Sequence, residues 1–308
     1  MRKVIGIGEA LLDIIFRDGQ PTTAVPGGSV LNAIVSLSRV GVPVHFISET
    51  GNDRVGRIIL RFLEENGIPT DTVSVFPYGQ SPVSLAFLDE QRDAEYLFYK
   101  SYPEKRLDID FPRIDEDDIV IVGSYFALDP VLHDKVLQLL DLARERRAIV
   151  YYDPNFRATH QAEAMKLAPT IIENLEHANV VRGSKDDFYY MYGLTDVDKI
   201  YRDKVGFYCP NFLCTSGGGQ ISLRTGVVAK EYDIRPVEVA STIGAGDNFN
   251  AGILYGLLKY DVRYDGLASL NEAMWDKIVH LGMEFSAEVC RGFGNSVSPD
   301  FAEKYRLL

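Results

Sequence analysis

The sequence predicts an α/β protein whose mainly parallel central sheet is covered by helices on both faces, giving three layers. Two observations support this fold class: short apolar strands alternate with amphipathic helices, and glycine-rich or polar segments follow several of the strands. No linker, repeat or low-complexity tract interrupts the pattern, so residues 1–308 are expected to form a single domain. The elements are expected as strands at 4–8, 45–48, 119–122, 148–152, 180–181 and 212–215, and as helices at 30–40, 58–66, 131–146 and 162–175.

One part of the chain departs from this alternation. Residues 83–88 and 95–99 have the composition of two strands around a polar turn at 89–93, and residues 11–16 and 22–25 can extend them into a small antiparallel sheet. We expect a lid, built from about 11–26 and 81–100, that covers a site and excludes water. The alternative is an edge hairpin without a role in a site.

Composition excludes several classes of protein. The chain is 46% hydrophobic and 25% charged, as in a soluble globular protein, and its net charge of −12 disfavours nucleic acid as a partner. No apolar run approaches the ~18 residues of a membrane span, and Glu9 and Asp13 interrupt the apolar N-terminus. The three cysteines form no C-x-x-C pair. These features predict a reduced, cytoplasmic protein with no membrane partner.

The segment 241–254 contains the most informative motif. Gly244, Ala245 and Gly246 form a turn that opens a helix, and Asp247 follows directly. The first amides of a helix have no intrahelical acceptor and carry partial positive charge, so this turn can bind an anion beside a carboxylate. An anion site and a base within one turn suit phosphoryl transfer to a hydroxyl. The alternative is an aspartate that only caps the helix.

A second glycine-rich turn, Gly27-Gly28, opens a helix near the other end of the chain. Asn32 lies one turn inside that helix, and its amide can both donate to and accept from a polyol. Asp13 follows the first strand, at the sheet edge where ligands bind in open α/β folds. A common loop and a solvated aspartate are the alternatives.

Two further segments follow strands. Pro154 enforces an extended turn after Asp153, so that Arg157 reaches the same sheet edge and can anchor an oxygen, unless it is simply a solvated arginine. The glycine-rich loop 215–219 suits contact with the phosphates or ribose of a nucleotide, and a plain hairpin turn is the alternative.

Ser184 and Asp187 have the spacing of a capping box, in which each side chain bonds to the backbone of the other residue. The residue types favour this helix cap, although the pair can also organise water around a magnesium ion. Two common nucleotide motifs are missing from the sequence. There is no G-x-x-x-x-G-K-[ST] motif, and the segment 6–11 ends in Leu11 where a dinucleotide fingerprint needs glycine or alanine, which disfavours a dehydrogenase.

Taken in order, these segments resemble the ribokinase-like (PfkB) carbohydrate kinase family over nearly the whole chain. The residues from Gly27 to Asn32 and from 46 to 56 look like its N-terminal signature, and those from Thr242 to Asp247 like its C-terminal one. Segments 8–13, 99–100 and 153–157 look most like the fructokinase branch, with 2-keto-3-deoxygluconate kinases as near relatives.

The resemblance implies transfer of the γ-phosphate of ATP to a sugar hydroxyl, with magnesium as cofactor and Asp187 as its ligand. It implies Asp247 as the base and the amides of Gly244, Ala245 and Gly246 as the anion site. The implied sugar contacts are Asp13, Gly27, Gly28, Asn32, Tyr99, Arg157 and Asp247. The implied nucleotide contacts are Ser184, Asp187, Thr215, Gly217, Gly219, Thr242, Gly244 and Gly246.

Three departures from the family pattern involve four positions. Ser241 replaces the usual aspartate that helps to hold a monovalent cation, which leaves potassium activation undecided. Ser184 and Asp187 replace an asparagine and a glutamate, so magnesium dependence is expected with weaker binding. Lys100 replaces an arginine and, as a point charge, cannot bind a carboxylate bidentately.

We therefore expect an ATP-dependent kinase of a ketose such as fructose. A 2-keto-3-deoxygluconate kinase and a weakly catalytic sugar-binding regulator are the alternatives. The exposed edge of the apolar lid strands further predicts a homodimer through the lid.

Overall fold

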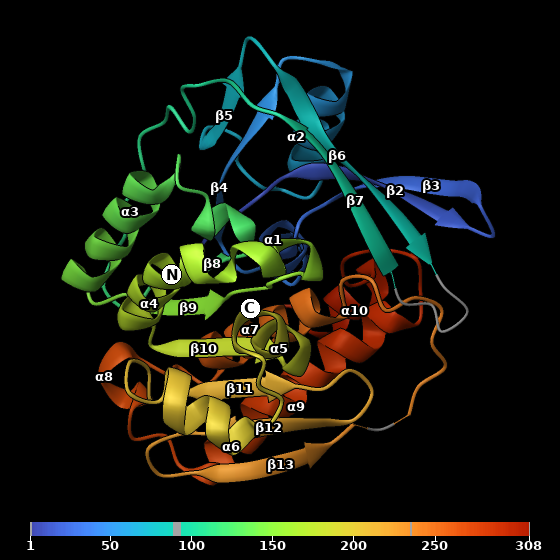
Figure 1. Ribbon diagram of the computed structural model, residues 1–308. Coiled ribbons are helices and arrows are strands. Elements are labelled where there is room, and N and C mark those ends of the chain that lie inside the picture. The colour runs from blue at the N-terminus through green and yellow to red at the C-terminus, as the bar shows by residue number, and fades with distance from the viewer. Residues whose placement is uncertain (1, 89–93, 235, 308) are drawn as a thin grey trace.

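A nine-stranded sheet forms the centre of the computed structural model, which describes residues 2–88, 94–234 and 236–307. Its strand order is β13-β12-β11-β10-β9-β8-β1-β4-β5 (Figure 1). Neighbouring strands from β5 to β11 run parallel, whereas β12 and β13 form an antiparallel edge. The strands are β1 (Val4–Ile7), β4 (Val44–Gly51), β5 (Val73–Phe76), β8 (Ile119–Gly123), β9 (Ile149–Asp153), β10 (Val180–Ser184), β11 (Phe212–Thr215), β12 (Gln220–Arg224) and β13 (Ala229–Asp233).

Helices cover both faces of this sheet. Side chains alternate along each strand, so Ile119 and Ile121 of β8 join the core on one face, whereas Val120 and Val122 join the core on the other. The first core includes α1 (Ser29–Arg39), α2 (Arg54–Glu65), α7 (Ala245–Lys259), α8 (Tyr264–Leu267), α9 (Glu272–Cys290) and α10 (Pro299–Lys304). The second includes α3 (His133–Glu145), α4 (Ala164–His177), α5 (Lys185–Tyr192) and α6 (Val197–Ile200), with short helical turns at Tyr125–Leu128 and Tyr201–Val205. A further helical turn, Ala158–Glu163, precedes α4 and has no buried residue. The expected three layers are confirmed.

A separate four-stranded sheet, called the lid below, projects from the body where the lid strands were predicted (Figure 1). Its strands are β2 (Leu11–Arg17), β3 (Gln20–Gly27), β6 (Gln80–Leu88) and β7 (Ala94–Ser101), in the order β3-β2-β6-β7. The lid is not purely antiparallel, because β2 and β6 run parallel. The polar turn expected at 89–93 lies outside the described residues.

Register decides which lid side chains face the body. Asp13 pairs with Ser84, and Ser84 pairs with Phe98, so these three share one face. On the same face, Ile15 and Ala86 form a small core with Ile243, which belongs to the turn before α7. The lid therefore packs onto the segment that leads to the predicted base.

Most expected elements are present with shifted ends. The helix expected at 58–66 begins earlier, at Arg54, because the Asp53 side chain accepts a hydrogen bond from the Gly56 amide and caps it. The segment expected as a helix at 162–175 is a short helical turn followed by α4, which accommodates Pro169 within its first turns. Within the described residues, no helix is long and apolar enough to span a membrane.

Candidate active site

Four loops meet at one edge of the central sheet, where the parallel strands end. Asp153 ends β9, Ser184 ends β10 and Thr215 ends β11, while the chain leaving β1 enters the lid through Asp13. The N-terminus of α7 approaches the same edge, as the bonds of Asp247 and Asn250 described below show. The sequence-predicted residues therefore come together at the carboxyl edge, where ligands bind in open α/β folds.

Asp247 is buried in the first turn of α7, with 7% of its surface exposed. Its Oδ2 accepts a hydrogen bond of 2.8 Å from Nδ2 of Asn32, which lies one turn inside α1. Burial raises the pKa of Asp247 to about 6, although the Asn32 bond and the Arg157 guanidinium act in the opposite direction. The carboxylate is thus oriented by a neutral donor and titrates close to neutral pH, which suits a general base.

Asp13 is the second buried carboxyl group of the site. Its Oδ1 accepts from the Ser84 hydroxyl in the lid, and its Oδ2 accepts from Nδ2 of Asn295 at 3.3 Å. Burial raises the pKa of Asp13 to about 6, and the charge of Asp247 adds to the rise. The two carboxyl groups therefore lie close together around one space, where the charge of Asp247 acts on Asp13.

The turn before α7 is held by side chains from outside it. Gly244 has a left-handed backbone with φ of 78°, which glycine adopts without strain. The side-chain amide of Asn248 donates through Nδ2 to the backbone oxygens of Gly244, at 2.8 Å, and Asn295, at 2.9 Å. The Ala245 amide donates to Thr242 O at 3.2 Å, so the amides that follow it in the first turn are the ones that would meet an anion.

The N-terminal glycines also lie at the site. A Cβ on Gly27 would overlap Oδ2 of Asp13, and a Cβ on Gly28 would overlap the carbonyl oxygen of Glu9. Both glycines therefore let α1 begin directly beside the Asp13 carboxylate, and Asn32 of this helix reaches Asp247.

Arg157 and the lid residue Tyr96 lie on another side of this space. The Arg157 guanidinium is 5.6 Å from the centre of the Tyr96 ring, and its charge lowers the pKa of both Asp13 and Asp247. Burial raises the pKa of the Tyr96 hydroxyl, and Asp13 adds to the rise. Arg157 is exposed, so its guanidinium is accessible to a ligand.

Tyr99 is not brought to this space. It pairs with Val83, on the face of the lid opposite to Asp13 and Ser84, and 60% of its surface is exposed. The alternation along β7 turns Tyr96 and Phe98 toward the body instead. A contact between Tyr99 and a sugar stays a prediction without support from this geometry.

The helix-cap interpretation of Ser184 and Asp187 is confirmed. The Ser184 hydroxyl accepts from the Asp187 amide at 3.1 Å, and Oδ2 of Asp187 accepts from the Ser184 amide at 2.6 Å. Burial raises the pKa of Asp187, and Asp153 adds to the rise. Oδ2 of Asp187 is thus occupied by the cap. Among the described residues, no cluster of three or more His, Cys, Asp or Glu side chains could hold a metal ion alone.

The loop after β11 has open space above it. Thr215 is nearly buried, whereas Gly217, Gly218 and Gly219 are exposed. A Cβ on Gly217 or Gly218 would meet no heavy atom within 4 Å. Gly217 has a left-handed backbone with φ of 55°, which glycine adopts without strain, and the space beside both glycines is open.

Four residues of the site were not singled out from the sequence: Ser84, Tyr96, Asn295 and Arg182. The period-two alternation of β7 separates Tyr96 from Tyr99, so this signal was available. Asn295 follows two glycines after the last long helix, which is a turn signal but no indication of a partner 282 positions away. Arg182 had no sequence signal beyond being a charged residue inside an apolar strand.

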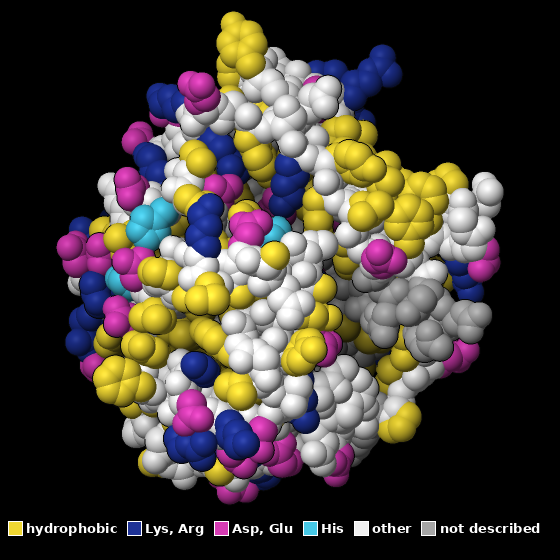
Figure 2. Space-filling model, viewed as in Figure 1, with side chains coloured by type: hydrophobic (Ala, Val, Ile, Leu, Met, Phe, Trp, Pro, Cys, Tyr) yellow, Lys and Arg dark blue, Asp and Glu magenta, His cyan; other side chains and the backbone are white. Residues whose placement is uncertain are grey.

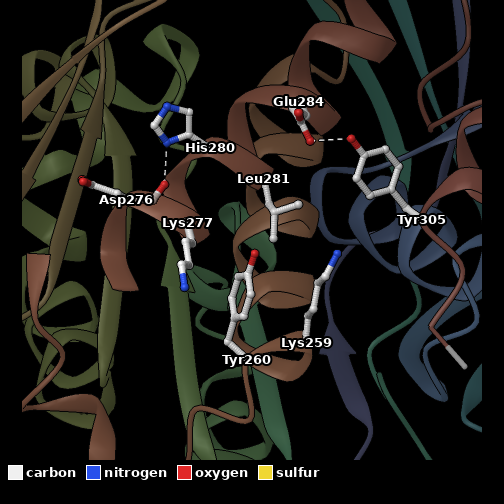
Figure 3. Close-up of a pocket in the computed structure, with 8 residues that line it drawn as sticks. All are labelled: Lys259, Tyr260, Asp276, Lys277, His280, Leu281, Glu284 and Tyr305. Atoms are coloured by element: carbon white, nitrogen blue, oxygen red, sulfur yellow. Dashed lines mark hydrogen bonds between the residues drawn. The ribbon is translucent and has the colours of Figure 1, made fainter. Parts of the chain in front are cut away.

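A second hollow lies elsewhere on the molecule. A shallow groove of about 410 Å³ lies between α7, α9 and α10, at the end of α7 far from Asp247 (Figure 3). Its carboxylates already have partners: Glu284 accepts from the Tyr305 hydroxyl, and Asp276 pairs with Lys230. Its geometry offers no base beside an anion site, so it is not the candidate active site.

The fold and the site together define a phosphotransferase architecture, with a helix N-terminus, a buried carboxylate and a lid at the carboxyl edge of a parallel sheet. The sequence matches the pfkB carbohydrate kinase family over residues 1–300. The chain belongs to this family and is a sugar kinase by that membership.

Curated relatives fall into two groups. A probable chloroplastic fructokinase-6 from Arabidopsis thaliana is 25% identical over 82% of this chain and 69% of its own length. A 5-dehydro-2-deoxygluconokinase from Geobacillus kaustophilus is 29% identical over 82% of this chain and 81% of its own. The relatives thus include kinases named for a neutral ketose and for a sugar acid.

Solved structures share the fold over the full length. A fructokinase double mutant from Vibrio cholerae O395, bound to fructose, ADP and potassium, superposes with a TM-score of 0.85 at 22% identity, covering 100% of this chain and 99% of that one. The aminoimidazole riboside kinase of Salmonella enterica, with its riboside and an ATP analogue, gives 0.82 at 21% identity, covering 99% and 100%.

Proposed function

We propose that this protein transfers the γ-phosphate of ATP to a hydroxyl of a neutral ketose such as fructose. The observation that carries the proposal is the Asn32–Asp247 bond, which holds a buried carboxylate at the N-terminus of α7. The same helix terminus supplies amides and a partial positive charge for the transferring phosphoryl group.

The reaction follows from this arrangement. The sugar hydroxyl donates its hydrogen to Asp247 while its oxygen attacks the γ-phosphorus, and ADP leaves as the bond to the bridging oxygen breaks. Phosphoryl transfer of this kind depends on positioning and charge stabilisation more than on a strong base, so a carboxylate with a pKa of about 6 is adequate. Asp13 would accept hydroxyls remote from the reacting one, and Arg157 would donate to another sugar oxygen.

The nucleotide would lie along the loop 215–219, with its phosphates pointing toward α7. Magnesium binds typically through one or two carboxylates together with substrate phosphates, so the single carboxylate of Asp187 fits an ion held mainly by ATP and water. When bound, that ion would neutralise charge on the phosphates. Because Ser184 already occupies Oδ2 of Asp187, we expect weaker magnesium binding than a free carboxylate provides.

We propose a neutral acceptor because the positive charge of Lys100 is already paired with a carboxylate of the protein. Lys100 lies on the body-facing side of β7, as Tyr96 does, and its Nζ pairs with Glu9 at 2.6 Å. Glu9 in turn adds to the raised pKa of Asp13, so this pair borders the sugar space. Lys100 therefore already has a carboxylate partner, and a sugar acid that bound to Lys100 would have to displace Glu9.

An assay of ADP release with ATP and magnesium tests the proposal. The panel holds fructose, tagatose, ribose, a nucleoside, 2-keto-3-deoxygluconate and 5-dehydro-2-deoxygluconate, each with and without potassium. We expect turnover with a ketose, and Asp247→Asn, purified identically, excludes a contaminating kinase. Preference for a sugar acid would contradict the neutral acceptor. Sugar binding without any turnover would favour the regulatory protein instead.

A substitution of Glu9 tests the argument from the Lys100–Glu9 pair. Glu9→Gln leaves Lys100 without its carboxylate, so the ratio of kcat/KM for sugar acids to that for ketoses should rise. An unchanged ratio would remove the Glu9–Lys100 pair from acceptor selection.

The outer face of the lid supports association of two copies. Ile14, Leu85, Leu97 and Tyr99 share this face, and Leu97 and Tyr99 are 46% and 60% exposed. Hydrophobic side chains gather over the lid at the upper right of Figure 2. Burying this face in a homodimer would remove exposed apolar surface and shield the strand edges.

A further inference from the structure

Arg182 is a buried arginine in the middle of β10, and it belongs neither to the implied sugar contacts nor to the implied nucleotide contacts. Only 5% of its surface is exposed. Its Nη1 donates to Oδ2 of Asp153 at 2.9 Å, and its Nη2 donates to Oγ1 of Thr215 at 2.7 Å. One guanidinium thus joins the ends of β9 and β11, which flank its own strand.

The same guanidinium lies against the first turn of α7. A Cβ on Gly246 would be 2.9 Å from Nη2 and 3.0 Å from Nη1 of Arg182. A side chain at 246 would therefore force the Arg182 guanidinium to shift, so glycine at 246 permits this close packing. Arg182 therefore packs directly on the backbone that offers its amides to an anion.

A second link ties α7 to the same anchor. Oδ2 of Asp153 also accepts from Nδ2 of Asn250 at 2.6 Å, and Oδ1 of the Asn250 side chain accepts from the Tyr151 hydroxyl at 2.9 Å. Asn250 is one turn beyond Asp247 in the same helix. The chain of bonds from Tyr151 to Thr215 consequently fixes α7 relative to three strands.

We propose that Arg182 is a positioning residue for phosphoryl transfer, holding the first turn of α7 and the start of the loop 215–219 in one arrangement. The proposal rests on the proposed kinase function, since the turn would carry the base and the loop would carry the nucleotide. A shift of about 1 Å between reacting groups can lower a rate about 100-fold. A rigid link between the two segments therefore has a direct catalytic consequence.

Arg182 also affects the pKa of Asp247, the proposed base. Asp247 is surrounded by charged or titratable groups from several elements: Asp13 on β2, Tyr96 on β7, Asp153 on β9, Arg157 after β9, and Arg182 on β10. The Arg182 guanidinium lowers the pKa of Asp247, whereas Asp153 raises it. Loss of the arginine charge alone should raise the pKa of Asp247.

The test compares Arg182→Met with Arg106→Met. Arg106 is a matched control, because its side chain is equally buried, at 5% exposure, and is bonded to two carboxylates, Glu49 and Asp129. For Arg182→Met we expect kcat to fall about 100-fold, the KM for ATP to rise, and the acid limb of the kcat/KM profile for the sugar to move to higher pH. Arg106→Met should lower the melting temperature without moving the acid limb.

Thr215→Val keeps the proposal testable if Arg182→Met does not fold, and Gly246→Ala adds a test where Arg182→Met does fold. Thr215→Val removes only the acceptor of Nη2 and keeps the ion pair with Asp153, so it should raise the KM for ATP while the acid limb stays in place. Gly246→Ala should lower kcat strongly in the wild-type background and much less when combined with Arg182→Met, because the contact is then relieved.

The outcomes separate the two proposals. One outcome is that Arg182→Met loses stability as Arg106→Met does while its acid limb and its KM for ATP stay unchanged. That outcome contradicts the positioning role and leaves the proposed function intact. A wild-type enzyme that phosphorylates no sugar contradicts the proposed function. Equal effects of Gly246→Ala in both backgrounds would contradict the contact on which the inference depends.

Discussion

Asn32 and Asp247 lie 215 positions apart in the sequence, yet the amide of one donates to the carboxylate of the other over 2.8 Å. Each residue stands in the first turn or two of a helix that begins at a glycine, Gly28 for α1 and Gly244 for α7. Two glycine-opened helices from opposite ends of the chain therefore meet at their N-termini and define the point where a hydroxyl would lose its proton.

The first prediction concerns the base. Asp247→Asn should lower kcat by roughly 10²–10⁴-fold, because an asparagine side chain cannot accept the proton of the acceptor hydroxyl. Sugar affinity should change little, since the variant side chain keeps the volume of aspartate and can still accept from Asn32. Steady-state kinetics and sugar titration by calorimetry measure both quantities.

Asp300→Asn is the matched control, because Asp300 also stands in the first turn of a helix, α10, but is exposed. It should behave as wild type. Near-normal kcat in Asp247→Asn would remove Asp247 from the catalytic role.

The second prediction links the same residue to stability. The native state holds the proton of Asp247 up to about pH 6, whereas the unfolded chain releases it near 3.8. Between these values the unfolded state binds fewer protons, so this group makes stability fall as pH rises. Asp247→Asn should therefore be more stable than wild type at pH 7.5, by at most about 3 kcal/mol from the shift of the pKa.

Melting temperatures from pH 4 to 8 check this prediction. The advantage of Asp247→Asn should shrink toward pH 4, where the wild-type carboxyl group is protonated in the native state. Equal stability of the two proteins at pH 7.5 would show that the buried charge of Asp247 does not destabilise the native state.

The third prediction concerns magnesium. Asp187→Asn should raise the magnesium concentration needed for half-maximal activity by about 10-fold or more, as is typical when a group supporting a metal is removed. Asp186→Asn is a close control, since Asp186 is adjacent in α5 but exposed. A magnesium dependence that is identical in both variants would exclude Asp187 from the metal site.

The fourth prediction decides between two tyrosines of β7. Tyr96→Ala should raise the KM for the sugar, because Tyr96 faces Arg157 and both carboxyl groups. Tyr99→Ala should leave the KM unchanged if the side chain acts only on the outer face. A raised KM in Tyr99→Ala alone would support the sugar contact that the family resemblance implies.

The fifth prediction concerns the lid surface. Leu97→Lys, placed on the outer face, should shift the protein toward monomer in sedimentation experiments while keeping its fold, because a charge there opposes burial of apolar surface. Lys185→Glu, on the body, changes a charge away from the lid and serves as control. A wild-type protein that is monomeric at every concentration would contradict the dimer.

Local patterns predicted the elements better than their tertiary partners. The continuous apolar runs of β1 and β8 and the cap at Ser184 were predictable, because burial on two faces and capping depend on neighbouring residues alone. The bond between Asn295 and Asp13 was not, since it joins a C-terminal turn to a lid strand across 282 positions. Arg182 was missed for the same reason: its function depends on the strand order, which sets Asp153 and Thr215 on either side of it.

The path of the chain from β1 into the lid has an evolutionary consequence. Asp13 and Ser84 belong to the lid, whereas Asn32, Asp247 and the amides of α7 belong to the body. Under the proposed function, substitutions in the four lid strands would change part of the acceptor contacts while the proposed base and anion site stay in place. Such a separation would let kinases with this fold accept different sugars while they keep the same groups for phosphoryl transfer.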